Sequence, residues 1–174
     1  MEPPKLSKVL RGYKICLTGF VSKMELLKMI NIVNRLGGVY AEKVAVDATC
    51  MIVNRVGGKD FKLGCQLKLT LVDVQWLHDC LQQNAALKMK NYPVKVFAGL
   101  IITCTQLIPE ERANLQQIVE ENGGTYSSRL VKDTVTHLIA KEAAGEKFSY
   151  AKLWNNVHVV DMKWVEECVR MKGS

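Results

Sequence analysis

The chain repeats itself once, with a period close to 87 residues. Four landmarks recur in the same order, and the offset between the two occurrences drifts by only one or two residues. Chance similarity does not keep several spacings constant in this way, so the pattern indicates two copies of one structural unit. The paired landmarks are Thr18 and Thr105, Gly37-Gly38 and Gly123-Gly124, Trp76 and Trp164, and Cys80 and Cys168.

Two small domains follow from this repeat. The 174 residues, of which 48% are apolar and 24% charged, suffice to give each copy a hydrophobic core. The segment between the copies contains Pro93 and several lysines, a composition typical of a linker. The predicted boundaries are an N-terminal extension over 1–11, repeat 1 over 12–87, a linker over 88–98 and repeat 2 over 99–174.

Within each copy, short apolar runs alternate with helical patterns. In repeat 2, Pro109 suits a first helical turn, and Asn122-Gly123-Gly124 can supply the left-handed cap that ends the helix. The order of elements is βαββαβα in both copies. Strands that alternate with helices favour a parallel sheet covered on both faces. We therefore predict an α/β fold with two tandem repeats, each a parallel four-stranded sheet flanked by helices.

The positive charge is concentrated in the first half of the chain. Residues 1–92 hold 14 Lys and Arg against 7 Asp and Glu, whereas residues 93–174 hold 10 of each. The net charge of +7 therefore belongs to repeat 1, and an anionic partner such as DNA is one interpretation. The other is a solvated surface, because the basic residues are scattered singly and few aromatic residues lie among them.

The landmarks, taken in order and found twice, resemble the BRCT domain, the repeat named after the C-terminus of the breast-cancer protein. The resemblance rests on the Gly-Gly pair after the first helix, the VTHLI strand, and the Trp of the last helix with a Cys four residues later. Repeat 2 is especially similar to the N-terminal repeats of the topoisomerase II-binding protein and its yeast checkpoint-scaffold relatives. These share a strand that ends in Cys-Thr and an early Arg in the next helix.

The resemblance implies a module that binds phosphoserine or phosphothreonine peptides. A phosphate group carries about −1.5 to −2 charges and three acceptor oxygens, so its pocket needs a hydroxyl, a free N–H and cations. In repeat 2 the family's phosphate ligands map to the Thr105 hydroxyl, the Gln106 N–H and Lys147. Arg112 corresponds to a further phosphate ligand of the topoisomerase-binding relatives.

Repeat 1 departs from this pattern. Thr18 and Gly19 fit the hydroxyl and the N–H, but the alignment of the second helices places Asp60 where the cation should stand. A one-residue shift of the helix start would bring Lys59 into that place instead. We therefore predict a weaker phosphate site in repeat 1, formed by Thr18, Gly19 and Lys59.

The remaining candidate residues are interpreted as structural. Trp76 and Trp164 have apolar neighbours at helical spacing and are predicted to lie in the core. His137 lies inside an apolar strand and is predicted to be a hydrogen-bonded structural residue. No CxxC pair, nucleophile motif or duplicated acidic pair occurs, so we expect neither catalysis, nor a cofactor, nor a metal site. The six cysteines are interpreted as free, mostly buried thiols of a reducing compartment: Cys16, Cys50, Cys65, Cys80, Cys104 and Cys168.

Taken together, the sequence predicts a phosphopeptide-binding scaffold module, monomeric and nuclear, that acts in DNA-damage and replication-checkpoint signalling. This cellular context comes from the family resemblance. Two alternatives stay open. One is a DNA-binding module that uses the basic repeat 1, and the other is an interaction module that binds its partner without phosphate. No apolar run approaches the roughly 18 residues that a membrane helix needs, so no membrane association is expected.

Overall fold

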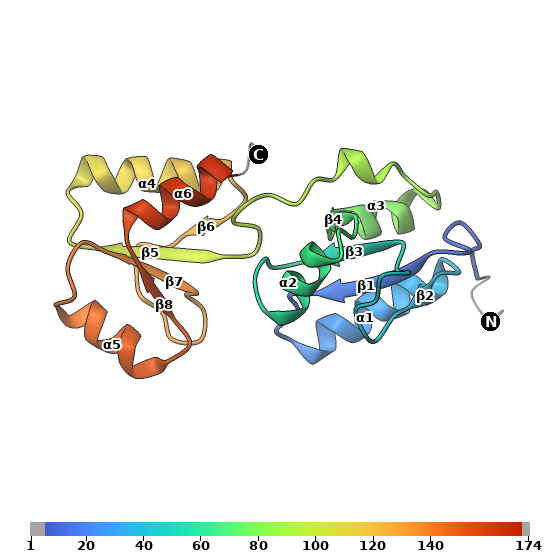
Figure 1. Cartoon of the computed structure of the whole chain (residues 1–174), viewed down its shortest axis with the longest axis horizontal. Helices are drawn as coiled ribbons and strands as arrows, with labels where there is room; N and C mark the ends of the chain where they lie inside the picture. Colours follow the sequence, from blue (N-terminus) through green and yellow to red (C-terminus); the bar gives the residue numbers. More distant parts are fainter. Residues whose placement is uncertain (1–5, 172–174) are drawn as a thin grey trace. The chain divides into compact units, whose positions relative to one another are not determined.

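The computed structural model describes residues 6–171, which form two compact units, the first ending at Val94 and the second beginning at Lys95. Each unit contains one parallel four-stranded sheet (Figure 1). The strand order is β2-β1-β3-β4 in repeat 1 and β6-β5-β7-β8 in repeat 2. The two sheets therefore have the same topology, and the predicted α/β fold with two βαββαβα repeats is confirmed.

The elements of repeat 1 follow the predicted order, with one additional 3-10 turn after the last helix. Their bounds are β1 Lys14–Thr18, α1 Lys23–Arg35, β2 Val39–Tyr40, β3 Cys50–Val53, α2 Lys59–Gln66, β4 Leu71–Asp73, α3 Gln75–Gln83 and η1 Met89–Asn91.

The elements of repeat 2 repeat this order. Their bounds are β5 Ile101–Thr105, α4 Pro109–Glu121, β6 Thr125–Tyr126, β7 His137–Ala140, α5 Glu146–Trp154, β8 His158–Val160 and α6 Met162–Met171.

Local sequence signals set the helix ends. Pro109 is the first residue of α4, where its missing N–H leaves no hydrogen bond unmade. The Asp161 carboxylate accepts a hydrogen bond from the Trp164 N–H at 3.0 Å and so caps α6. Gly37 and Gly123 follow the first helix of their repeats with φ near +85°, the left-handed conformation that ends a helix. The predicted caps are therefore confirmed.

The helices pack on both faces of each sheet. In repeat 1, alternate strand residues point to opposite faces, so Ile15 and Ile52 lie in the core under α1 and α3. Cys16 and Met51 lie in a second core that includes Phe61 of α2. In repeat 2, α4 and α6 lie on one side of the sheet and α5 on the other (Figure 1).

Trp76 and Trp164 differ in burial, which corrects part of the prediction. Trp76 is fully buried, and its indole N–H donates to the Leu87 carbonyl at 2.8 Å. The segment after α3 thus folds back over this ring. Trp164 is only partly buried, and its ring stacks on Phe97 and His137. The prediction of a core residue holds for Trp76 and is wrong for Trp164.

The segment predicted as a linker is packed near both of its ends. The Tyr92 carbonyl accepts from the Asp73 N–H at 2.9 Å, and the Tyr92 hydroxyl donates to Asp79 at 2.7 Å. Phe97 is fully buried, and its N–H donates to the Asn122 carbonyl at 2.8 Å. Each end of the segment therefore belongs to the fold of the repeat it adjoins.

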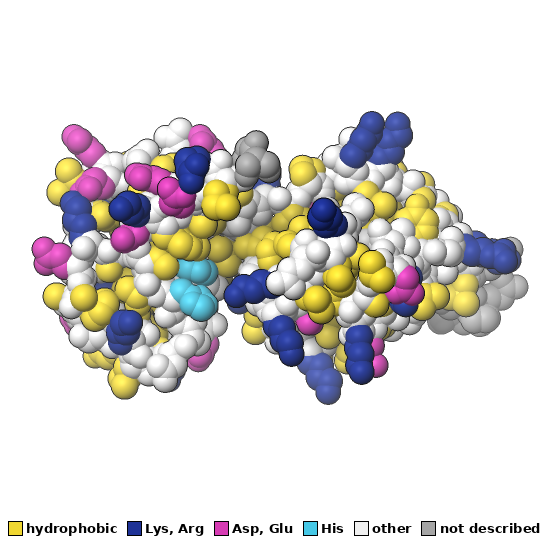
Figure 2. Space-filling model, in the orientation of Figure 1, with side chains coloured by type: hydrophobic (Ala, Val, Ile, Leu, Met, Phe, Trp, Pro, Cys, Tyr) yellow, Lys and Arg dark blue, Asp and Glu magenta, His cyan; other side chains and the backbone are white. Residues whose placement is uncertain are grey.

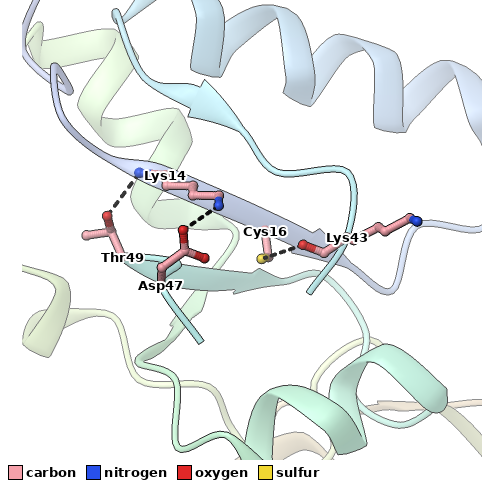
Figure 3. Close-up of polar contacts among 5 residues, drawn as sticks. All are labelled: Lys14, Cys16, Lys43, Asp47 and Thr49. Carbon is pink, nitrogen blue, oxygen red and sulfur yellow. Dashed lines mark hydrogen bonds and ion pairs between the residues drawn. The ribbon is translucent and has the colours of Figure 1, made fainter. Parts of the chain in front are cut away.

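A threonine ties the start of the first strand to the loop before the third strand in both repeats. In repeat 1, Thr49 Oγ1 accepts from the Lys14 N–H at 2.9 Å, and Lys14 Nζ pairs with Asp47 at 2.6 Å (Figure 3). In repeat 2, Thr136 Oγ1 accepts from the Ile101 N–H at 3.0 Å. This end of each sheet is thus fixed by the same interaction.

The parallel register brings the functional segments together at the opposite end of each sheet. Thr18 is level with Val53, and Thr105 is level with Ala140, so the loops after β1 and β3, and after β5 and β7, leave the sheet side by side. The carboxyl edge of a parallel sheet is where ligands of open α/β folds commonly bind. The predicted site residues therefore lie at the same edge in both repeats.

The surface charge differs between the repeats. On the face shown in Figure 2, Lys and Arg predominate over repeat 1, whereas acidic and basic side chains are mixed over repeat 2. This agrees with the uneven charge of the sequence. No helix within residues 6–171 is long and apolar enough to cross a membrane.

Candidate functional site

One cavity in repeat 2 brings together all four residues that the sequence predicts. Its volume is about 320 Å³, and it opens at the carboxyl edge of the sheet, between the start of α4 and the start of α5. This cavity is called the repeat 2 pocket below. It is lined by Cys104, Thr105, Gln106, Leu107, Arg112, Tyr126, Ser128 and Lys147.

Gln106 connects the two sides of the pocket. Its backbone has φ +66°, a left-handed conformation that turns the chain sharply after β5. Its side chain bridges to the loop before α5, because Nε2 donates to the Ala144 carbonyl and Oε1 accepts from the Glu142 N–H, both at 2.7 Å. Among residues 6–171, no acceptor is found for its own backbone N–H. Gln106 thus presents a free donor while it fixes the loop that leads to Lys147.

Lys147 points into the pocket. Its Nζ donates to the Cys104 carbonyl at 3.0 Å and to the Ser128 carbonyl at 3.4 Å. The ion pairs found among the described residues include neither Lys147 nor Arg112. Two cations therefore face one cavity without a carboxylate to neutralise them, and α5 adds the positive end of its dipole. The pocket is suited to an anion.

Four lining residues are absent from the sequence-based prediction of the site: Cys104, Leu107, Tyr126 and Ser128. Burial, and then its contact with the Cys104 thiol, raise the pKa of Tyr126 to about 12. A sequence signal did exist, because a tyrosine follows the Gly-Gly pair by two residues in both repeats, as Tyr40 and Tyr126. A tyrosine at this place is also typical of a strand. Only the fold shows that Tyr126 lines the repeat 2 pocket and that Tyr40 does not line the repeat 1 pocket.

A second cavity of about 320 Å³ adjoins the repeat 2 pocket along α5. It shares Ser128 and Lys147 with that pocket, and its outer part is more apolar. The rings of Tyr150 and Trp154 lie 5.7 Å apart there. An extended ligand anchored at Lys147 can therefore continue along this surface. The lining residues are Ser128, Arg129, Leu130, Glu146, Lys147, Tyr150 and Trp154.

The corresponding cavity of repeat 1, called the repeat 1 pocket, has a volume of about 370 Å³. It brings together the three predicted residues of the weaker site, Thr18, Gly19 and Lys59, and it also contains Arg55 and Asp60. Its other lining residues are Phe20, Val21, Gly57 and Gly58.

The helix starts settle which residues of the two pockets correspond. Gly58 and Gly145 precede α2 and α5 with nearly the same backbone angles, φ 88° and ψ 173° against φ 97° and ψ 168°. Counting from these caps, Lys59 is the first helical residue and Asp60 the second, the position that Lys147 holds in α5. Gly57 and Gly58 both have positive φ, which is not helical, so α2 begins directly after Gly58.

The Arg112 position is also different in repeat 1. Arg112 is the fourth residue of α4, and the fourth residue of α1 is Leu26. In the loop before the second helix the charges are reversed, because Arg55 stands where repeat 2 has Glu142. The lining of the repeat 1 pocket therefore combines Arg55 and Lys59 with the carboxylate of Asp60, whereas the charged residues that line the repeat 2 pocket are Arg112 and Lys147.

Gly19 is required by the local geometry of repeat 1. It has φ +83°, and a Cβ atom there would lie 2.3 Å from the backbone N and O of Arg55. Its carbonyl accepts from the Asn54 side chain at 3.2 Å. The close approach of the two loops thus excludes a side chain here, whereas Gln106 in repeat 2 uses its side chain to bridge the wider gap.

Family models match most of the chain. A model described as "BRCA1 C Terminus (BRCT) domain" matches residues 5–81, and one described as "twin BRCT domain" matches residues 100–164. The two matches fall on the two repeats of the structure.

Similar proteins and structures are found over nearly the whole chain. The S-M checkpoint control protein rad4 of Schizosaccharomyces pombe is 26% identical over 173 residues, which are 94% of this chain and 26% of that protein. Human Protein ECT2 is 23% identical over 165 residues, 90% of this chain and 18% of that protein. The chain therefore spans only about a fifth to a quarter of the length of these relatives.

The crystal structure of Rad4 BRCT1,2 in complex with a Crb2 phosphopeptide superposes with a TM-score of 0.69. It is 24% identical to this chain, and the superposition covers 94% of this chain and 93% of that one. The complex of the same domains with an Mdb1 phosphopeptide gives the same TM-score at 23% identity. These likenesses establish a shared fold over both repeats.

Proposed function

The chain belongs to the BRCT family, with one BRCT domain in each repeat, and from this premise we propose that repeat 2 binds phosphoserine or phosphothreonine peptides. The proposal is supported by the two Rad4 structures, which hold phosphopeptides on the same tandem fold. It rests above all on one observation. Thr105, Gln106, Arg112 and Lys147 line a single cavity, and neither of its two cations is paired with a carboxylate of residues 6–171.

Each group has a defined task in this binding mode. The Thr105 hydroxyl and the Gln106 N–H donate to phosphate oxygens, and the Arg112 guanidinium and the Lys147 ammonium supply positive charge. In the free protein Lys147 donates to two carbonyls. A phosphate dianion is a stronger acceptor, and such charge-assisted hydrogen bonds contribute roughly 1.5–3 kcal/mol each. Binding therefore exchanges weak internal contacts for stronger ones to the ligand.

In the proposed binding mode, the peptide residues that flank the phosphorylated residue lie along α5. The cavity that shares Ser128 and Lys147 with the repeat 2 pocket extends past Tyr150 and Trp154. Aromatic rings there provide contact area for an apolar side chain of the peptide. The phosphate would thus supply the anchor, and this surface would select among peptide sequences.

Repeat 1 is proposed to bind phosphate more weakly, through Thr18, Gly19 and Lys59. Asp60 lines the same cavity and repels an anion, and Leu26 holds the position of Arg112. Repeat 2 is therefore the primary reader of the phosphorylated partner.

In the cell, the module would act as a nuclear scaffold that recruits phosphorylated proteins in DNA-damage and replication-checkpoint signalling. This role is supported by the similarity to the S-M checkpoint control protein rad4. The proposed module is a monomer that works by binding, without catalysis or a cofactor.

A screen against a degenerate phosphoserine and phosphothreonine peptide library, with its unphosphorylated twin, tests the proposal. Phosphate-dependent capture should be lost in Lys147→Ala and largely kept in Lys59→Ala, because losing one charge-assisted bond costs about tenfold or more in affinity. Capture that does not depend on phosphate would contradict the proposal. If DNA were retained instead, with an affinity that falls steeply with salt, the function would belong to the basic repeat 1.

A further inference from the structure

The Tyr126 hydroxyl is an unexpected group in the wall of the repeat 2 pocket. Tyr126 ends the edge strand β6, level with Ile102 of β5. The chain then turns through Ser127 to Ser128, whose carbonyl accepts from Lys147. Tyr126 thus lines the same cavity as Arg112 of α4 and Lys147 of α5, and it is partly buried.

The present hydrogen-bond partner of this hydroxyl is a poor one. The Tyr126 oxygen lies 3.5 Å from the Cys104 sulfur, and a thiol is only a weak donor and a weak acceptor. Cys104 is buried at the end of β5, and its backbone carbonyl is the group that accepts from Lys147. A strong acceptor that entered the pocket would compete readily for the tyrosine proton.

The hydroxyl also keeps its proton at any physiological pH. Burial is the main cause that raises the pKa of Tyr126, and the charge of Arg112 lowers it only in part. A neutral phenol can therefore donate to an anion throughout the working range, without adding a negative charge beside it.

Building on the proposed function of repeat 2, we propose that the Tyr126 hydroxyl is an additional phosphate ligand, which leaves the Cys104 sulfur and donates to a phosphate oxygen when the phosphopeptide binds. Five groups from five segments would then surround the phosphate: Thr105, Gln106, Arg112, Tyr126 and Lys147. Tyr126 would donate from the β6 side, which none of the other four covers.

Repeat 1 contains a natural control for this assignment. Tyr40 ends β2 as Tyr126 ends β6, and the two are level with corresponding residues, Ile15 and Ile102. Burial raises the pKa of Tyr40 as well. Tyr40 does not line the repeat 1 pocket, and Leu17 stands where repeat 2 has Cys104. Removing either hydroxyl alone should therefore change the stability of the fold by a similar amount, but only the removal of the Tyr126 hydroxyl should lower the affinity for the phosphopeptide.

The test compares Tyr126→Phe with Tyr40→Phe in the full chain. A phosphothreonine peptide selected by the library screen is titrated by calorimetry, and the melting temperature of each variant is measured. Tyr126→Phe should weaken binding about tenfold or more, as expected for the loss of one hydrogen bond to a charged group. Tyr40→Phe should leave the affinity within twofold, and the two variants should melt within about 2 °C of each other.

The outcomes separate this assignment from the proposed function. If the parent binds and Lys147→Ala does not, but Tyr126→Phe binds like the parent, Tyr126 is no ligand and the repeat 2 pocket stands. A loss of affinity in Tyr126→Phe that comes with a clearly lower melting temperature than in Tyr40→Phe would also overturn the assignment, because the hydroxyl would then be structural. If the parent shows no phosphate-dependent binding, the proposed function itself fails.

Discussion

Asp60 and Lys147 occupy the same position in the two repeats, each the second residue of a helix that begins after a glycine with φ near +90°. The fold around them is the same, and the side chains carry opposite charges. This difference, together with Leu26 at the position of Arg112, separates two pockets that share a threonine at the end of the first strand and a left-handed residue after it. The pockets therefore offer a controlled comparison within one molecule.

The charge at this position should control phosphate affinity. In a Lys147→Ala background, which disables repeat 2, the further change Asp60→Lys should strengthen binding of a phosphopeptide to repeat 1 by about tenfold or more, because a repulsive charge becomes an attractive one. Glu42→Lys makes the same charge change outside the lining of the pocket and should have little effect. Equal gains from both variants would show that only the net charge matters.

The side chain of Gln106 should matter for the geometry of the pocket. Gln106→Ala removes both hydrogen bonds to the loop before α5 and leaves an alanine at positive φ, whereas Gln106→Gly removes the bonds but accepts this φ. Denaturant unfolding should find the alanine variant less stable than the glycine variant by about 1 kcal/mol. Both should bind the phosphopeptide more weakly than the exposed helical control Gln116→Ala. Parent-like affinity in both would show that the bridge does not position Lys147.

Gly19→Ala should destabilise repeat 1 strongly. The added Cβ would meet backbone atoms of Arg55 at 2.3 Å, and the residue would keep φ +83°. A forced left-handed alanine together with a backbone clash is expected to cost roughly 2–4 kcal/mol in unfolding free energy. Gly12 also has positive φ but has open space around it, so Gly12→Ala should cost only the conformational part, about 1 kcal/mol. Equal losses of unfolding free energy in Gly19→Ala and Gly12→Ala would show that the close approach of Arg55 to Gly19 does not matter.

Acid should weaken the stability of repeat 2 through Glu111. The hydrogen bond from Lys141 at 2.8 Å, and then that from the Ile108 N–H, lower the pKa of Glu111 below its ordinary value of 4.5. A carboxyl group with a lowered folded-state pKa stabilises the fold above its unfolded-state pKa, and this contribution is lost as the pH falls through the folded-state pKa. Thermal unfolding between pH 6 and pH 3 should therefore show a smaller acid-induced loss in Glu111→Gln than in the parent. An unchanged pH profile would mean that the ion pair contributes nothing.

The fold was largely predictable from the sequence because the signals were local and repeated. Pro109 begins α4, and the Gly-Gly pairs end the first helices, as their sequence patterns indicate. The Gly-Gly signal occurs in both repeats, so the pattern in one repeat was supported by the other. The prediction that Trp164 lies in the core was wrong, because a helical pattern does not show how far the neighbouring elements cover a side chain.

The candidate site was only partly predictable. The four residues taken from the family pattern line the repeat 2 pocket, but Tyr126, Ser128 and Arg55 enter the pockets through strand register and loop paths. The correspondence between Leu26 and Arg112 also required the structure, because it depends on where α1 and α4 begin. Residues that are brought together by a loop produce no periodic pattern in the sequence. Residues next to a helix cap can be located from the sequence, because the cap itself has a recognisable pattern.

The most direct test of phosphate binding in repeat 2 is a nuclear magnetic resonance titration of the full chain with a phosphothreonine peptide and its unphosphorylated twin. The Gln106 amide should move strongly downfield with the phosphopeptide, because its N–H gains a charged acceptor, while the Gly19 amide of repeat 1 should shift much less. Large shifts that avoid residues 105–107 and 147, or the same shifts with the unphosphorylated peptide, would contradict the account.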